Sequence, residues 1–328
     1  MAICKIWQMS WVVAIAVGVA LGGARCEDYP SRPVTLVVPY APGGGTDVLA
    51  RMLAQELRDR LKQPFVVENR PGAATQTAAA AVAKTPPDGY TLLMSSSTTM
   101  ATNVSIYKSL PYDPINDFAP IALVGSAYFL LVANPSVPAR TLPELIAYIK
   151  SQPPGSLSYG TSGAGTPHHL FMELFMKMTG TKMQQVPYRG SAPALTDVIS
   201  GVIPMMIVDL TPALPLITDG RIRAFGVTAA SRVKTAPDIS TIAEAGLPGY
   251  AAQGWFGIVA RVGTPKPIID TLNSVLTTYL KRPDVQDRLY NIGIQPLTST
   301  PEEFEKFIPQ DIKKWAQVAK DAGIQPIE

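Results

Sequence analysis

The stretch VVPYAPGGGTDVLARML, residues 37–53, joins an apolar run to a helical pattern through Pro42 and three successive glycines. Glycine loses more conformational entropy on folding than other residues, so three in a row mark a place where the backbone bends sharply or approaches something closely. The flanking patterns predict a strand that ends at the loop and a helix that begins there. Four interpretations are open: a phosphate cradle, a catalytic turn, a carboxylate receptor or a tight connection.

Two nucleotide-binding motifs do not fit this loop. A Walker loop closes with Gly-Lys-Ser/Thr, whereas Gly45 is followed by Thr46 and Asp47. The dinucleotide spacing G-x-G-x-x-G fails because its last position holds Val48. A helix N-terminus still offers unpaired N–H groups and a partial positive charge, which favour an anion. Asp47 could cap the helix, and a tight turn without a ligand remains an open interpretation.

Residues 1–26 are typical of a signal peptide. A positive start precedes a continuous apolar run over 11–21, which is too short for a membrane span of about 20 residues. Ala24 and Cys26 place small residues at a cleavage site after residue 26. The alternatives are a retained anchor and lipidation of Cys26, which Arg25 disfavours. We therefore expect export, with cleavage of this segment.

The composition excludes several functional classes. Charged residues make up 16% of the 328, and the net charge of +3 falls to +1 when Lys5 and Arg25 leave with the leader. This balance gives no electrostatic support for binding to nucleic acid or a membrane surface. Both cysteines, Cys4 and Cys26, also leave, so the mature chain has no disulfide, thiol nucleophile or thiolate metal site. We expect a globular monomer, and its length favours two domains.

Strands and helices alternate in two sets. The first set has strands over 34–38, 65–67 and 90–94, separated by a leucine-patterned helix and an alanine-rich helix that ends near residue 84. The second has a helix over 141–151, another from about 167, and strands over 157–159, 183–186, 205–208 and 222–227. Two strand-like runs flank Gly125-Ser126 between the sets, and 265–323 is expected to be helical. This order predicts an α/β fold of two lobes, each a mainly parallel sheet flanked by helices, with a cleft between them.

Two further polar loops accompany the glycine loop. Ser95–Thr99 (SSSTT) follows a strand in the first set, and Tyr159–Thr166 (YGTSGAGT) follows one in the second. Ligands of open α/β sheets gather at the carboxyl ends of strands, where these loops fall. They offer backbone N–H groups and hydroxyls but no paired carboxylates, general base or nucleophile. The residues therefore predict a binding protein for a small anion, with no catalytic residues and no cofactor.

A serine hydrolase that uses Ser162 is the alternative from another class. A nucleophile elbow needs glycine two residues after the serine, and Ala164 stands there. The only histidines, His168 and His169, are adjacent to the loop, whereas a triad base normally lies far along the sequence. They also lack further ligands at the spacing of a metal site, so no metal is expected.

Several motifs together resemble one family, the extracytoplasmic solute receptors of the tripartite tricarboxylate transporters, also called Bug-type receptors. The resemblance runs from about Pro33 to near the C-terminus. Its motifs include VVPYAPGGGTDVLARMLAQEL, VVENRPGAATQTAAAAVAKTPPDGYTLL, LPYDPINDFAPI, SYGTSGAGTPHHL, VPYRGSAPALTDVISG and PDISTIAEAGLPGY…GWFGIVA. The ordered set is specific, although no single motif would be.

The resemblance implies a two-lobed periplasmic binding protein of type II that closes like a flytrap on a carboxylated solute. It would deliver this solute to a membrane permease of two subunits, or, as the alternative, signal to another partner. We expect lobe 1 to comprise 27–125 and 251–328, and lobe 2 to comprise 126–250. The family's Tyr-Lys-Gly becomes Tyr188-Arg189-Gly190 here, and Pro42 precedes the glycines where many relatives carry a small residue.

The expected ligand-binding residues come from both lobes. Asp209 could accept a hydrogen bond from a hydroxyl or amine, or could brace the hinge. The aromatic residues Tyr40 and Trp255 are candidates for ligand contact, and the identity of the carboxylate or related solute stays open. The full set is Tyr40, Ala41, Gly44, Gly45, Thr46, Asp47, Ser96, Thr98, Thr161, Ser162, Gly165, Thr166, His168, Tyr188 and Asp209.

Overall fold

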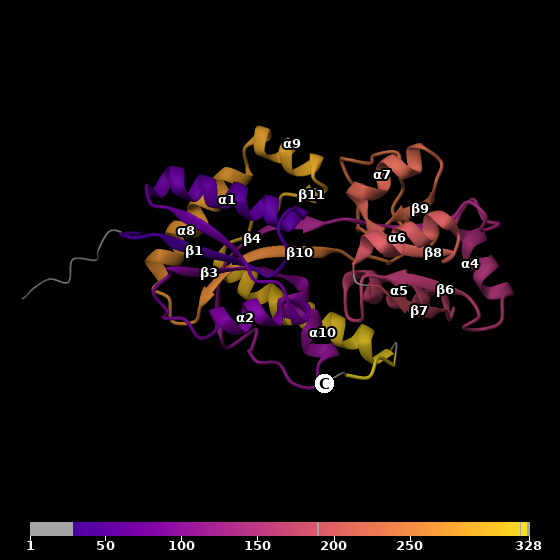
Figure 1. Cartoon of the computed structure of the whole chain (residues 1–328), viewed down its shortest axis with the longest axis horizontal. Helices are drawn as coiled ribbons and strands as arrows, with labels where there is room; N and C mark the ends of the chain where they lie inside the picture. Colours follow the sequence, from indigo (N-terminus) through magenta and orange to yellow (C-terminus); the bar gives the residue numbers. More distant parts are fainter. Residues whose placement is uncertain (1–28, 189, 322, 327–328) are drawn as a thin grey trace, which may run out of the picture.

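The computed structural model describes residues 29–188, 190–321 and 323–326 and shows two α/β lobes side by side (Figure 1). Each lobe is built around one sheet. The predicted two-lobed architecture is confirmed. The predicted signal peptide lies outside the described residues.

The lobe 1 sheet has six strands, and its order mixes early and late segments of the chain. The order is β11 (Ile294–Gln295), β4 (Phe118–Ala127), β10 (Gly254–Arg261), β3 (Thr91–Ser96), β1 (Val34–Val38) and β2 (Phe65–Asn69). β1 pairs in parallel with β2 and β3, whereas β10 runs antiparallel to β3 and β4, and β11 antiparallel to β4. This sheet is mixed, not mainly parallel as expected, because the late strand β10 enters its centre in the opposite direction.

Helices cover both faces of the lobe 1 sheet. Alternate residues of β1 point to opposite faces, as a pleated strand requires, so Leu36 and Val37 belong to different core clusters. The Leu36 cluster lies beneath α1 (Gly45–Leu61), α8 (Lys266–Leu280) and α9 (Pro283–Asn291). The Val37 cluster packs against α2 (Gln76–Val82) and α10 (Pro301–Asp321).

The lobe 2 sheet has five strands and is also mixed. Its order is β7 (Gln184–Pro187), β6 (Ser158–Thr161), β8 (Met205–Asp209), β5 (Phe129–Ala133) and β9 (Arg223–Val227). β6 runs parallel to β7 and β8, and β5 runs antiparallel to β8 and β9. α6 (Ser191–Ser200) and α7 (Leu210–Thr218) cover one face, and α4 (Leu142–Ser151) and α5 (Pro167–Thr179) cover the other.

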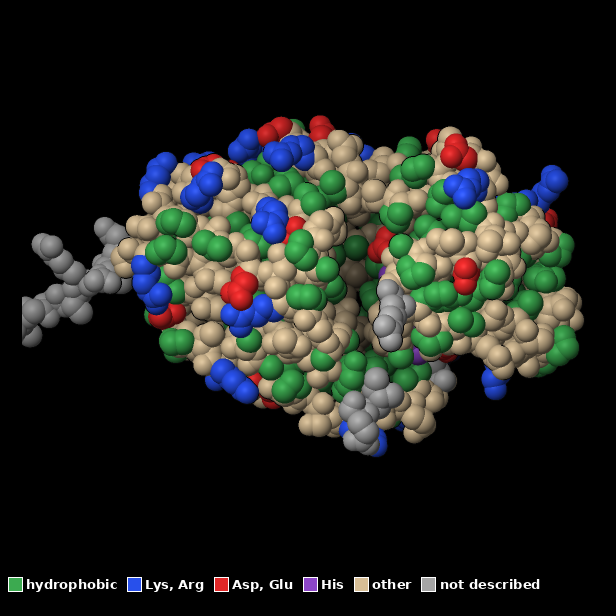
Figure 2. Space-filling model, viewed as in Figure 1, with side chains coloured by type: hydrophobic (Ala, Val, Ile, Leu, Met, Phe, Trp, Pro, Cys, Tyr) green, Lys and Arg blue, Asp and Glu red, His purple; other side chains and the backbone are tan. Residues whose placement is uncertain are grey.

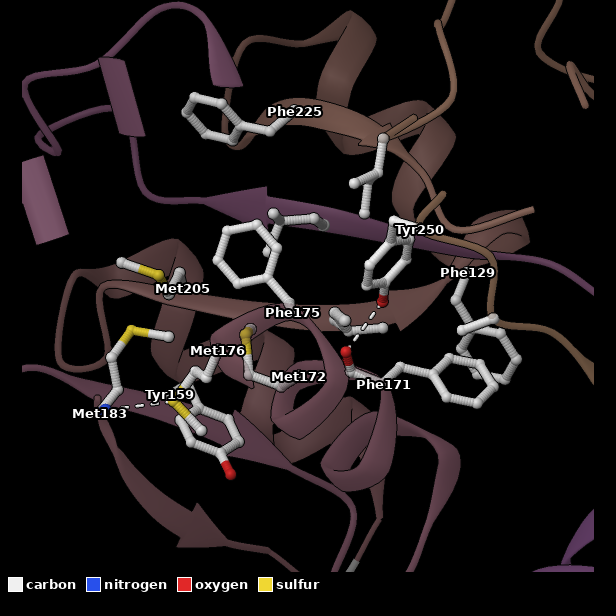
Figure 3. Packing of buried hydrophobic residues seen from close by; sticks show 14 of the residues in the cluster. Phe129, Tyr159, Phe171, Met172, Phe175, Met176, Met183, Met205, Phe225 and Tyr250 are labelled. Carbon is white, nitrogen blue, oxygen red and sulfur yellow. Dashed lines mark hydrogen bonds between the residues drawn. The ribbon is translucent and has the colours of Figure 1, made fainter. Parts of the chain in front are cut away.

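The core beneath α5 is aromatic and rich in methionine (Figure 3). Phe171 of α5 packs edge-on against Phe129 of β5 and accepts a hydrogen bond from the Tyr250 hydroxyl at its carbonyl, at 2.8 Å. Its ring also stacks on Trp315 of α10, with 5.2 Å between ring centroids. Because Phe304 of the same helix belongs to the lobe 1 core, α10 packs against both lobes.

One local prediction needs correction, and two strands were missed. The break between two strands was expected at Gly125-Ser126. β4 instead continues through these two residues, and only Tyr128 separates it from β5. β10 and β11 were not predicted, although the tail is otherwise helical as expected. The expected lobe boundaries fall inside β4 and three residues before β10, and they stay a prediction.

Candidate ligand-binding cleft

The glycine loop is exposed and ends at the N-terminus of α1. Gly43 turns the chain with a φ of +88°, and a Cβ added at Gly43 or Gly44 would meet nothing within 4 Å. These two glycines therefore do not serve close packing inside the protein. The first N–H groups of a helix have no partner within it, so the loop presents backbone donors at the positive end of a 17-residue helix.

Asp47 holds this loop in place. Its side chain is 5% exposed, and Oδ2 accepts hydrogen bonds from the Gly43 N–H at 3.0 Å and from Arg51 at 2.9 Å. Oδ1 accepts one from Asn69, whose amide also donates to the Tyr40 carbonyl. Burial works to raise the pKa of Asp47, but these hydrogen bonds outweigh it and hold the pKa below its ordinary value. Asp47 thus braces the loop and does not cap α1, whose N-cap is Gly44.

Hydroxyl groups line the lobe 1 side next to the loop. The Tyr40 hydroxyl lies 2.8 Å from Ser96 Oγ, which lies 3.1 Å from Thr99 Oγ1. The Ser95–Thr99 segment is not a loop, because β3 runs to Ser96 and the helical stretch η2 begins at Thr98. Burial raises the pKa of Tyr40, and the charge of Asp209 from lobe 2 raises it further.

A left-handed turn adjoins these hydroxyls and was missed by sequence reasoning. Ala73, Ala74 and Thr75 have φ values of 42°, 47° and 78°, where non-glycine residues cost about 1–2 kcal/mol each. Thr75 accepts a hydrogen bond from Thr99 at 2.9 Å, and Asn103 donates to the Ala74 carbonyl at 2.8 Å. Gly72, directly before the turn, was the only nearby residue whose type could have predicted it. The expected alanine-rich helix therefore starts only at Gln76.

The second polar loop brings side chains from lobe 2. Thr161 Oγ1 accepts hydrogen bonds from Gln185 and the Gly163 N–H, and Thr166 Oγ1 donates to the Gly163 carbonyl at 2.7 Å. These two hydroxyls therefore hold the loop. The Gly165 carbonyl accepts a hydrogen bond from Thr102 of lobe 1 at 3.4 Å, which ties the loop to the other lobe.

Ser162, His168 and Asp209 form a chain of hydrogen bonds. Ser162 Oγ lies 2.7 Å from His168 Nδ1, and His168 Nε2 lies 3.2 Å from Asp209 Oδ2. Sequence reasoning treated six residues as too short a separation for such a pair, but the start of α5 folds His168 back over the loop. In serine hydrolases the base meets the serine at Nε2 and the carboxylate at Nδ1. Here the two nitrogens are exchanged.

Two aromatic candidates are engaged elsewhere. The Tyr188 hydroxyl donates to Asp197 at 2.6 Å, and burial raises its pKa to about 12. Trp255 is 2% exposed and donates to Asp311 at 2.7 Å, so it lies in the core, away from any ligand surface. The neighbouring Arg189 is outside the described residues.

The surface is hollowed between the two lobes (Figure 2). The lobes also touch at Gly293, where an added Cβ would meet Thr211 at the start of α7. A separate cavity of about 660 Å³ lies on lobe 2, and none of the expected ligand-binding residues lines it. Within the described parts of the chain, no cluster of three or more potential metal ligands occurs, and no helix has the length and apolarity to cross a membrane.

Comparison with known proteins shows which family the chain belongs to. The sequence matches the tripartite tricarboxylate transporter family receptor over residues 49–324. The chain belongs to this receptor family. Protein BugT of Bordetella pertussis is 38% identical to the receptor over 298 residues, which cover 90% of this chain and 91% of BugT. The predicted family resemblance is confirmed.

Two solved structures of relatives carry a carboxylate. R. palustris Rpa4515 with adipate has a TM-score of 0.82 and 40% identity, and the alignment covers 92% of this chain and all of that one. MatC from Rhodopseudomonas palustris with bound malate has a TM-score of 0.76 and 33% identity, over 88% and 99% of the two chains. Family members are periplasmic substrate-binding receptors and not enzymes. The receptor is therefore a periplasmic solute-binding protein, which leaves the hydrolase alternative without support.

Proposed function

We propose that the receptor captures a small carboxylate between its lobes and delivers it to a two-subunit membrane permease. The observation that carries the proposal is the open glycine loop at the N-terminus of α1, beside the Tyr40 and Ser96 hydroxyls. Unpaired N–H groups and hydroxyls satisfy a carboxylate without needing a cation. The relatives that bind adipate and malate support the same class of solute.

Closure of the lobes would follow from ligand binding. A solute that contacts both walls binds the closed arrangement more tightly than the open one, and this difference shifts the population toward closure. The expected contacts are the glycine loop and hydroxyls on lobe 1, and the Thr161–Thr166 loop with His168 on lobe 2. A permease could then distinguish loaded from empty receptor by shape.

A thermal-shift screen tests carboxylate capture. The mature chain from residue 27 is unfolded, refolded to remove retained solute, and heated with members of a carboxylate library. A ligand that binds only the folded state raises the Tm in proportion to the logarithm of its excess over Kd. We expect one class of carboxylate to raise the Tm selectively, and an unchanged Tm throughout the library would refute the proposal. Uptake of that solute in cells with and without the permease then tests delivery.

A further inference from the structure

The second histidine of the chain, His169, lies behind the lobe 2 loop and is 6% exposed. Its Nδ1 accepts a hydrogen bond from the Gly165 N–H at 3.1 Å, and its Nε2 lies 3.5 Å from Glu173 Oε1. A backbone N–H can only donate, so Nδ1 carries no proton, and the single ring proton is assigned to Nε2 from this network. Neutral His169 therefore acts as a buried acceptor for the backbone of the loop.

This hydrogen bond resembles one half of a helix-capping motif. In a capping box, the side chain of the third helical residue reaches back to a backbone N–H at the start of the helix. α5 has Thr166 as its N-cap, so His169 stands at the third position. The Thr166 hydroxyl does not cap α5 but donates to the Gly163 carbonyl. His169 reaches one residue further back than a capping-box side chain, so it binds the loop and not the helix itself.

Gly165 is held from both lobes at once. Its carbonyl accepts a hydrogen bond from Thr102 of lobe 1 at 3.4 Å, while its N–H donates to His169 of lobe 2. Its φ of +74° suits a glycine, and an added Cβ would come within 2.8 Å of Ile106 in α3 (Asn103–Ile106). The place where the loop touches lobe 1 is therefore set on the lobe 2 side by the His169 ring.

Glu173 ties the two ends of the loop together. The loop begins where β6 ends and finishes where α5 starts. The Tyr159 hydroxyl of β6 donates to Glu173 Oε1 at 2.5 Å, and the same oxygen faces His169 Nε2. Side-chain networks in which every member has a partner fix a geometry more firmly than single bonds do. The strand before the loop and the helix after it thus share one carboxylate, which keeps the His169 ring in the orientation that meets Gly165.

We propose that His169 is a positioning residue for solute binding, which holds Gly165 in place so that the lobe 2 loop is ordered before the lobes close. This inference rests on the proposed function, because it concerns the loop that would meet the solute. A loop that is ordered in advance costs less binding free energy than one that the solute must order. Without the His169 acceptor, closure would have to order the loop and bury the Gly165 N–H without a partner.

Two substitutions of His169 test this role through their covalent geometry. Asn places its Oδ1 near the position of Nδ1 and keeps the acceptor for Gly165, whereas Gln places its polar atoms near the position of Nε2 and keeps only the contact with Glu173. The refolded mature receptor is titrated calorimetrically with adipate, malate and the carboxylate that gives the largest Tm shift in the library. We expect His169→Gln to weaken binding about tenfold, through the loss of a buried hydrogen bond, and His169→Asn to stay within about threefold of the wild type.

Amide hydrogen exchange, followed by NMR without solute, reports on the same contact. The Gly165 amide should be protected in the wild type and in His169→Asn, and should exchange at least about tenfold faster in His169→Gln. A role in packing alone would instead lower the Tm of both variants and leave their affinities equal. If either variant does not fold, the protection of the Gly165 amide in the wild type decides.

The outcomes distinguish the two proposals. Equal affinities of the two variants, or a Gly165 amide that is unprotected in the wild type, overturn the role of His169 and leave carboxylate capture standing. If no carboxylate of the library binds the wild-type receptor, the proposed function is overturned, and the positioning of a solute site falls with it even where Gly165 stays protected.

Discussion

Two aspartates at helix starts illustrate how the setting of a residue decides its task. Asp47 is buried and uses both carboxylate oxygens to hold the glycine loop. Asp209 is partly exposed, and its Oδ2 lies 3.2 Å from His168 Nε2. Both residues were predicted as ligand contacts from the sequence, which shows the position of a carboxylate but not the number of its hydrogen bonds.

Asp47→Asn should lower the free energy of unfolding by about 1–3 kcal/mol at pH 7, because the hydrogen bonds of a buried charge are weakened. The folded-state pKa of Asp47 lies below its unfolded value, so its stabilisation is complete above about pH 4 and is lost as the pH falls through the folded pKa. Urea unfolding of both proteins at pH 7 and pH 3 measures this difference. Asp59→Asn, exposed on the same helix, is the control. If Asp47→Asn lowers the free energy of unfolding equally at both pH values, the charge of Asp47 is not the source of the stabilisation.

Ala73→Gly should raise the free energy of unfolding by about 1 kcal/mol, because glycine removes the cost of the left-handed backbone at that residue. Ala80→Gly, inside α2, should lower it by about the same amount, since a glycine weakens a regular helix. Denaturant titration compares the two variants. Destabilisation by both would indicate that Ala73 does not adopt the left-handed conformation in solution.

At the scale of elements, the packing of α10 on β10 joins the end of the chain to the centre of the lobe 1 sheet. Gly257 of β10 faces Phe304 of α10, and an added Cβ would collide with its ring. Trp255 of the same strand donates to Asp311 of the same helix. This contact explains why a glycine stands in the middle of a buried strand.

Gly257→Ala should lower the free energy of unfolding by about 1–3 kcal/mol, the usual cost of overpacking. Combining it with Phe304→Leu should cost less than the sum of the single changes, because the smaller side chain makes room for the methyl group. Gly254→Ala in the same strand is the control, since its added Cβ would come no closer than 3.5 Å to Phe129. Urea unfolding measures the free energies of unfolding. If the losses of the two single variants simply add in the double variant, Gly257 and Phe304 are not in contact.

At the scale of the whole molecule, the approach of the lobes depends on small residues at their contacts. Gly293 of lobe 1 meets Thr211 of lobe 2, and Gly165 of lobe 2 meets Ile106 of lobe 1. Side chains at these glycines would hold the lobes apart. A receptor that closes on its solute therefore needs small residues at these positions, so that the two lobes can approach each other.

Gly293→Ala should weaken solute binding about tenfold. The added methyl group would disfavour the closed state, and a cost of about 1.4 kcal/mol lowers the apparent affinity by that factor. Adding Thr211→Ala should restore much of the affinity by removing the clash. Gly180→Ala is the control, because Gly180 is equally left-handed at a φ of +65° but has open space around it. Calorimetric titration measures affinity, and an equal effect of both single variants would assign the loss to backbone strain alone.

The elements with clear periodicity were predicted well from the sequence. β1 was predicted to the residue, and the strands that end at Ser96 and Asp209 were placed within two residues of their observed ends. Such elements follow from the short-range pattern of apolar residues: a short β-branched run predicts a strand such as β1, which is buried on both faces, and a spacing of three to four residues predicts a helix. The ordered motifs also identified the receptor family, which the comparison confirms.

Only the tertiary structure decided which distant segments meet. β10 runs antiparallel to both its neighbours in the sheet, which makes the sheet mixed and not mainly parallel. Its partners, β3 and β4, lie more than a hundred residues earlier in the chain, so no local pattern could predict the pairing. The hydrogen-bond chain from Ser162 to Asp209 likewise joins a loop, a helix and a separate strand. Long-range pairing depends on the packing of the whole molecule, so no local pattern encodes it. The sequence by itself determined most of the elements, the family and the two glycine-containing polar loops, and the tertiary contacts decided the strand order, the course of Ser95–Thr99 and how the two lobes meet.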